Sequence, residues 1–165
     1  MQRINYCEID LDAIRQNVRV MRAAIHGGAK LLAVVKADAY GHGAVPVARA
    51  ALGAGAQMLA VAIPEEGIEL REAGITAPIL VLGGIDESAA EAVVSAGLTQ
   101  VVFDEARVRA LSDAGVRLGR TAQVHIKLDT GMGRIGVRTP EEAAALAALI
   151  DSLPGIGLTV LLNLL

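Results

Sequence analysis

The sequence repeats a helix-then-strand pattern, and this repetition limits the possible folds more than any other feature. Helix-like stretches end at an alanine followed by a glycine, and a short apolar run comes next each time. These glycines are Gly55, Gly74, Gly97 and Gly115, at spacings of 19, 23 and 18 residues. A unit of this length holds a strand of about five residues, a helix of about ten and two short loops. The chain is therefore predicted to consist of consecutive βα units.

The apolar runs are the predicted strands, five from residue 31 to residue 128 and a sixth near residue 160. They are Leu31–Val35, Leu59–Ile63, Ile79–Leu82, Gln100–Phe103, Gln123–Leu128 and Leu158–Leu162. The predicted helix starts, where acidic residues occupy the first turn, are Pro64, Asp86, Asp104 and Thr139. Ahead of these units we predict a strand at Ile4–Ile9 and a helix capped by Asp10 or Asp12. Each glycine named above is predicted to cap the preceding helix.

Composition excludes several classes of protein. A net charge of −3 gives no reason to expect nucleic acid or an anionic membrane as a partner. The lone cysteine, Cys7, excludes an internal disulfide and fits a reducing compartment. No apolar run reaches the ~20 residues of a spanning helix, and the N-terminus lacks the apolar segment of a signal peptide. We therefore expect a cytoplasmic protein, and no metal-ligand cluster is predicted.

The stretch Ala33–Gly43 reads Ala-Val-Val-Lys-Ala-Asp-Ala-Tyr-Gly-His-Gly and begins within a predicted buried strand. Lys36 ends that strand, so it lies at the carboxyl edge of the sheet, where α/β proteins keep their chemistry. On residue type alone, a lysine there is a solvated side chain. Burial or a neighbouring cation would instead lower its pKa and make the amine a nucleophile toward aldehydes.

This stretch resembles the cofactor-lysine motif of the alanine racemase family, in which an apolar strand leads into Lys-Ala-(Asp or Asn)-Ala-Tyr-Gly-His-Gly. The resemblance implies that Lys36 carries pyridoxal 5′-phosphate (PLP) as a Schiff base. It also implies that Tyr40 contacts the cofactor phosphate. Leu80 and Leu82 match family positions that line the cofactor pocket, and both would equally suit a plain core.

The stretch Val124–Val137, which reads Val-His-Ile-Lys-Leu-Asp-Thr-Gly-Met-Gly-Arg-Ile-Gly-Val, resembles a second motif of the same family. The resemblance implies that Arg134 reaches the cofactor ring oxygen and the substrate carboxylate, which suits the fork of a guanidinium. Lys127 matches a family lysine that is often carbamylated. Alternation puts four polar residues on one strand face, which would point inward in a barrel: Gln123, His125, Lys127 and Asp129.

Repeated βα units make either a closed (β/α)8 barrel or an open doubly wound sheet, and their period does not choose between the two. The resemblance, which covers about residues 5 to 157, favours the barrel, because alanine racemases have an N-terminal (β/α)8 barrel and a mainly β C-terminal domain. A complete barrel takes about 250 residues. We expect residues 1–165 to form an incomplete TIM-type α/β barrel of about five to six βα units, without the C-terminal β domain.

The leading function that the resemblance implies is PLP-dependent racemisation of L-alanine to D-alanine, which would supply D-alanine for peptidoglycan. Racemisation needs an acid/base group on each face of the carbanion at Cα. In the family the second group is a tyrosine of the C-terminal domain across a homodimer, and neither Tyr6 nor Tyr40 takes its place. We expect a truncated chain with little activity of its own. Three alternatives stay open: a racemase for serine or other small amino acids, a non-catalytic PLP-binding barrel, and an open-sheet binding module without a cofactor.

Overall fold

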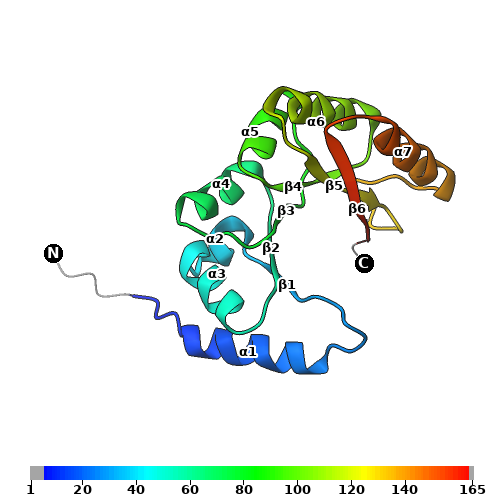
Figure 1. Cartoon of the computed structure of the whole chain (residues 1–165). Coiled ribbons are helices and arrows are strands. Elements are labelled where there is room, and N and C mark those ends of the chain that lie inside the picture. The colour runs from blue at the N-terminus through cyan, green and yellow to red at the C-terminus, as the bar shows by residue number, and fades with distance from the viewer. Residues whose placement is uncertain (1–5, 164–165) are drawn as a thin grey trace.

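The structure is a computed structural model that describes residues 6–163 of the chain (Figure 1). Its strands are β1 Leu32–Val34, β2 Met58–Val61, β3 Ile79–Val81, β4 Thr99–Val102, β5 Ala122–Leu128 and β6 Ile156–Asn163. Its helices are α1 Leu11–Ala24, α2 Lys36–Gly41, α3 Ala44–Gly53, α4 Pro64–Glu72, α5 Ala90–Ser95, α6 Glu105–Leu118 and α7 Pro140–Ser152, with the 3-10 turn η1 Glu87–Ala89 before α5. All the strands predicted from residue 31 onward are present, within two residues at each end.

The six strands pair in parallel and follow the order of the sequence, from β1 to β6. Figure 1 shows them along the concave side of an open arc, with α3 to α7 on the convex side. A parallel sheet that curves in this way, with a helix between successive strands, is the wall of a βα barrel. The predicted incomplete barrel of five to six βα units is confirmed.

The main core lies between the sheet and the outer helices. Leu59 and Val61 of β2 belong to it, together with Leu70 of α4 and Leu111 of α6. Ala60 lies between Leu59 and Val61 in β2 but faces the other side of the sheet, where it belongs to a separate inner cluster. Because both faces of the central strands are buried, these strands are continuous apolar runs rather than alternating ones.

The N-terminal prediction holds for the helix but not for the strand. Asp10 caps α1, because its Oδ1 accepts hydrogen bonds from the backbone N–H groups of Asp12 (2.8 Å) and Ala13 (3.0 Å). The predicted strand Ile4–Ile9 is wrong where it can be judged: residues 6–9 belong to no strand or helix, and residues 4 and 5 lie outside the described residues. Among the described residues, residues 6–9 lie beside no strand that could pair with their backbone groups.

Three of the four predicted capping glycines stand just after helix ends with positive φ. They are Gly55, Gly74 and Gly97. The prediction for Gly115 is wrong, because this residue lies inside α6, and Gly119 ends that helix in the left-handed conformation. A Cβ atom on Gly115 would collide with the carbonyl oxygen of Gly155. Gly115 therefore permits α6 to approach the turn before β6 closely.

We predict that Gly115→Ala destabilises the chain by about 3 kcal/mol, because the added methyl group meets backbone that cannot move aside. The measurement is the midpoint of urea unfolding. Gly53→Ala is the matched control, since nothing lies within 4 Å of its added Cβ, and there alanine should be neutral or slightly stabilising. Equal stability of the two variants would contradict the close approach.

The sheet has two open edges within residues 6–163, because β1 and β6 each pair with only one strand. β6 also exposes Leu158, Val160 and Leu161. A cavity of about 570 Å³ lies between β6 and α7, where Leu158 and Leu161 face Ala147. Apolar edges of this kind favour self-association, and we expect it of this chain.

Candidate functional site

Lys36, two residues after the end of β1, is the first residue of α2 and leads directly into a left-handed helical turn. Ala37, Asp38, Ala39 and Tyr40 have φ angles between 51° and 57° and ψ angles between 36° and 50°. L-residues other than glycine adopt this conformation at a cost of about 1–2 kcal/mol each. Four such residues in a row require strong local contacts to hold them, and strain of this kind is typical of functional sites.

Hydrogen bonds fix this turn at both ends. At its start, the backbone N–H of Ala37 donates to Glu66 Oε1 at 2.6 Å. At its end, Asp38 Oδ1 accepts from the N–H of Ala44 at 2.6 Å, which ties the turn to the first residue of α3. The Asp38 carbonyl also accepts from the N–H of Gly43 at 2.9 Å. Carboxylate acceptors are well suited to this task, since charge-assisted hydrogen bonds are stronger than neutral ones.

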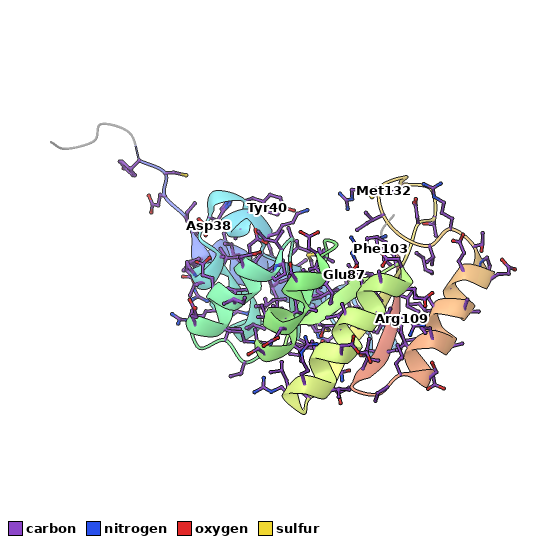
Figure 2. The ribbon with its side chains drawn as sticks, turned by 90° about the horizontal axis from the view of Figure 1, so that it is seen from above. Asp38, Tyr40, Glu87, Phe103, Arg109 and Met132 are labelled. Carbon is purple, nitrogen blue, oxygen red and sulfur yellow. The ribbon has the colours of Figure 1, made fainter. Side chains whose placement is uncertain are left out.

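The turn opens onto a cavity of about 570 Å³ at the carboxyl edge of the sheet. Lys36 and Tyr40 line it from one side, and Arg134 lines it from the loop after β5. The Lys36 Nζ lies 5.9 Å from the centre of the Tyr40 ring. Figure 2 shows Tyr40 and Met132 at the same edge of the molecule; Met132 also lines the cavity. Lysine, phenol and guanidinium therefore line one cavity, although Arg134 lies about a hundred residues after the other two in the sequence.

The two predicted leucines lie in different places. Leu82 lines the same cavity as Lys36. Leu80 does not: it is buried in the inner cluster with Ala60 and Val101. Leu80 thus forms part of the apolar inner face of the sheet, while Leu82 reaches the cavity itself.

The loop that carries Arg134 is closed on itself by Asp129. Its Oδ1 accepts hydrogen bonds from the backbone N–H groups of Gly133 (2.9 Å) and Gly131 (3.2 Å). These backbone donors hold the pKa of Asp129 below its usual value. The loop ends are joined by two further bonds, from Asp129 N to Val137 O and from Val137 N to Lys127 O. The Arg134 side chain is exposed at the tip of this closed loop.

Lys127 is a buried cation on the inner face of β5. The residue is 2% exposed, and its Nζ donates a hydrogen bond to the Leu128 carbonyl at 2.9 Å. Burial lowers the pKa of Lys127, and the nearby positive charge of Arg134 adds to this against the opposing charge of Asp129. His125, two residues earlier on the same face, is also buried, and burial lowers its pKa too. Of the residues predicted to face inward, His125 and Lys127 are buried, whereas Gln123 is exposed.

The lowered pKa of Lys127 sets a pH dependence of stability. At pH values below the pKa of Lys127 in the folded chain, the ammonium is charged in both the folded and the unfolded chain, and its burial opposes folding. At pH values above 10.5, the ordinary lysine pKa, the amine is neutral in both, and this free-energy cost of folding disappears. We predict that Lys127→Met stabilises the chain near neutral pH by about 1–3 kcal/mol, and that this gain shrinks toward pH ~10. Urea unfolding of both chains in CO2-free buffer measures the difference. A gain that stays constant with pH would show that the charge is not the cause.

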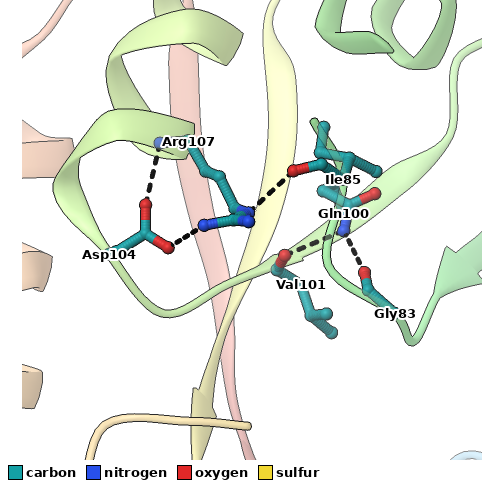
Figure 3. A network of polar contacts seen from close by, with 6 residues as sticks. All are labelled: Gly83, Ile85, Gln100, Val101, Asp104 and Arg107. Carbon is teal, nitrogen blue, oxygen red and sulfur yellow. Dashed lines mark hydrogen bonds and ion pairs between the residues drawn. The ribbon is translucent and has the colours of Figure 1, made fainter. Parts of the chain in front are cut away.

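The third wall of the cavity comes from the loop after β3, which contains Gly83 and Gly84. Gln100 holds this loop from the side of the helices, because its Nε2 donates to Gly83 O at 2.7 Å and to Val101 O at 2.9 Å (Figure 3). Arg107 donates from Nε to Ile85 O at 2.8 Å, two residues further along the loop. A Cβ atom on Gly83 would lie 2.5 Å from the carbonyl oxygen of Ala62, so this loop packs tightly on its neighbour.

Arg107 is itself oriented by two further contacts. Its guanidinium pairs with the Asp104 carboxylate (Figure 3). The guanidinium also lies 5.0 Å from the centre of the Phe103 ring. Neither Gln100 nor Arg107 is part of either sequence motif. The one sequence signal that could have pointed to Gln100 is its polar side chain within an otherwise apolar predicted strand.

Two kinds of feature are absent from residues 6–163. No group of three His, Cys, Asp or Glu side chains in this part of the chain could hold a metal ion. No helix described there is long and apolar enough to cross a membrane.

Comparison with known proteins gives one consistent result. The profile of the family described as "Alanine racemase, N-terminal domain" matches residues 9–164. The alanine racemase of Desulfovibrio desulfuricans is 48% identical over 153 residues, which are 93% of this chain and 41% of that protein. The alanine racemase of Symbiobacterium thermophilum is 53% identical over 139 residues, 84% of this chain and 37% of that protein.

A solved structure agrees with these sequences. The alanine racemase of Bacillus anthracis with bound L-Ala-P superimposes with a TM-score of 0.89 at 38% identity, over 99% of this chain and 42% of that chain. The chain thus spans about two fifths of the length of the relatives that it matches. The profile match also extends past residue 157, so it includes β6.

Proposed function

Because this chain belongs to the alanine racemase family, by a profile match over residues 9–164, we propose that it forms the cofactor-lysine part of a PLP-dependent enzyme that interconverts L-alanine and D-alanine. In this proposal residues 1–165 are part of the cofactor-binding barrel domain, and the mainly β domain lies outside them. The amino-acid substrate, the homodimer and the supply of D-alanine in the cytoplasm belong to the same proposal.

One observation carries the proposal: Lys36, Tyr40 and Arg134 line a single cavity. Their chemistry fits PLP and an amino acid. A primary amine can condense with an aldehyde, while a guanidinium and a phenol can bind a carboxylate and a phosphate. The apolar wall at Leu82 and the glycines at 83 and 84 leave room for a planar ring.

Each residue then has a distinct task. Bound PLP would supply an electron sink for the negative charge left when the substrate Cα loses its proton. The Lys36 amine would hold the cofactor and carry a proton to or from one face of Cα. Arg134 would pair with the substrate carboxylate and the ring oxygen, and the Tyr40 hydroxyl would donate to the phosphate. Leu82 would bound the ring, with Leu80 packed behind it.

Lys127 is proposed to act as a carbamate. Its lowered pKa favours the neutral amine, which adds to CO2 and releases one proton. The product is an anion on the inner face of β5, near Arg134, and it would replace the present repulsion between the two side chains by attraction. A bicarbonate-dependent mass gain of one CO2, absent from Lys127→Met, would support this.

Cofactor attachment gives the direct test. The chain contains three lysines, Lys30, Lys36 and Lys127. We predict that incubation with PLP and reduction with borohydride leave a covalent adduct on Lys36, found by peptide mass spectrometry, and that Lys36→Ala abolishes it. Lys30→Ala is the matched control, since Lys30 is exposed and outside the cavity. An adduct spread evenly over all three lysines would show nonspecific labelling and would count against a cofactor site at Lys36.

The proposal also predicts how the isolated chain handles alanine. Tyr6 is exposed near the N-terminus and Tyr40 is assigned to the phosphate, so Lys36 is the single proton carrier proposed here. With one carrier, the Cα proton of one enantiomer should exchange with solvent deuterium much faster than that of the other, with little net racemisation. Mass spectrometry and chiral chromatography measure both. Rapid racemisation by this chain alone would overturn the view that a second group is needed.

A further inference from the structure

The left-handed turn after Lys36 depends on a side chain that lies 29 residues away in the sequence. Glu66, in the first turn of α4, uses both carboxylate oxygens as acceptors. Oε1 accepts from Ala37 N at 2.6 Å, and Oε2 accepts from Ala62 N at 2.7 Å and from Ile63 N at 3.3 Å. One carboxylate therefore joins the loop after β1 to the loop after β2.

All three partners of Glu66 are N–H donors, and this restricts which side chain can take its place. A carboxylate offers two acceptor oxygens, whereas a carboxamide offers one oxygen and one NH2 donor. Glutamine at this position would have to turn its NH2 group toward the N–H of Ala37 or that of Ala62. One of the two loops would then lose its bond and face a repelling donor.

Helix capping does not account for this arrangement. As the third residue of α4, Glu66 would cap the helix through Ile63 N alone, and that is the longest of the three bonds. The shortest bond goes instead to Ala37, the first left-handed residue. Because Ala37 follows Lys36 directly, its position decides where the lysine side chain leaves the backbone.

We propose that Glu66 is a positioning residue, whose carboxylate holds the left-handed turn and thereby keeps the Lys36 amine in the cavity. Glu66 does not line that cavity, while Lys36, Ala62 and Ile63 do, so it acts through the backbone on either side. The effect on cofactor attachment rests on the proposed function, whereas the effect on the turn does not.

The test compares Glu66→Gln with Glu65→Gln. Glu65 is exposed in the same helical turn, so its change removes the same charge. The first measurement is amide hydrogen exchange by NMR without cofactor. Glu66→Gln should speed exchange at Ala37 or Ala62 by about tenfold or more, as expected for a lost charge-assisted hydrogen bond. Glu65→Gln should exchange like the unchanged chain. Unchanged protection at both amides in Glu66→Gln would overturn the proposal.

The second measurement is the rate at which PLP forms the borohydride-trapped adduct on Lys36. Glu66→Gln should slow it by about tenfold, in line with the lost bond, and Glu65→Gln should not. Lost amide protection with an unchanged rate would overturn the positioning role. If the unchanged chain forms no adduct, the proposed function fails, and the exchange measurement still decides whether Glu66 holds the turn.

A rescue variant separates this role from a general need for Glu66 in folding. Ala37→Gly removes the penalty of positive φ at the first left-handed residue. Added to Glu66→Gln, it should restore part of the adduct rate, and it should restore folding if the single variant does not fold. A double variant that remains as slow, or as unfolded, as Glu66→Gln would overturn the proposal.

Discussion

Parallel pairing of neighbouring strands is the constraint from which the site follows. Because β1 to β6 all run in the same direction, their carboxyl ends meet at one edge of the sheet. The loops after β1, β2, β3 and β5 therefore surround one cavity. Chemistry that no single segment could supply is assembled there from an amine, a phenol and a guanidinium. The cavity forms even though the sheet is not closed within residues 6–163.

The sequence permits prediction of those parts of the fold that depend on local pattern. Apolar runs predict the strands, the capping glycines predict the ends of α3, α4 and α5, and Asp10 and Thr139 cap the helices whose starts they predict. Lys36 and Arg134 stand in long motifs, and this is why a resemblance is enough to place them in one site. The inward direction of the Lys127 side chain follows from the alternation of side chains along a strand, which repeats every two residues.

The remaining features depend on contacts that a local pattern does not contain. The residues of the left-handed turn, Ala37 to Tyr40, have no intrinsic preference for positive φ, so their conformation depends on Glu66 and Asp38. Gly115 resembles a helix cap in the sequence, but its neighbour is Gly155, forty residues later. Leu80 and Leu82 are two residues apart and so share one strand face, yet only Leu82, just after the end of β3, lines the cavity. Each of these outcomes is decided by tertiary packing, which overrides local preference.

The order of the strands also bears on how the chain reaches this structure. Each strand pairs with the next one in sequence, so every pairing closes a loop of similar size, from about 20 residues to about 34 between strand starts. Since doubling a loop costs only about 0.6 kcal/mol of closure entropy, no pairing is strongly preferred as the first to form. Folding can then begin at any βα unit and spread outward in both directions, and the nucleus is set by side-chain packing rather than by topology.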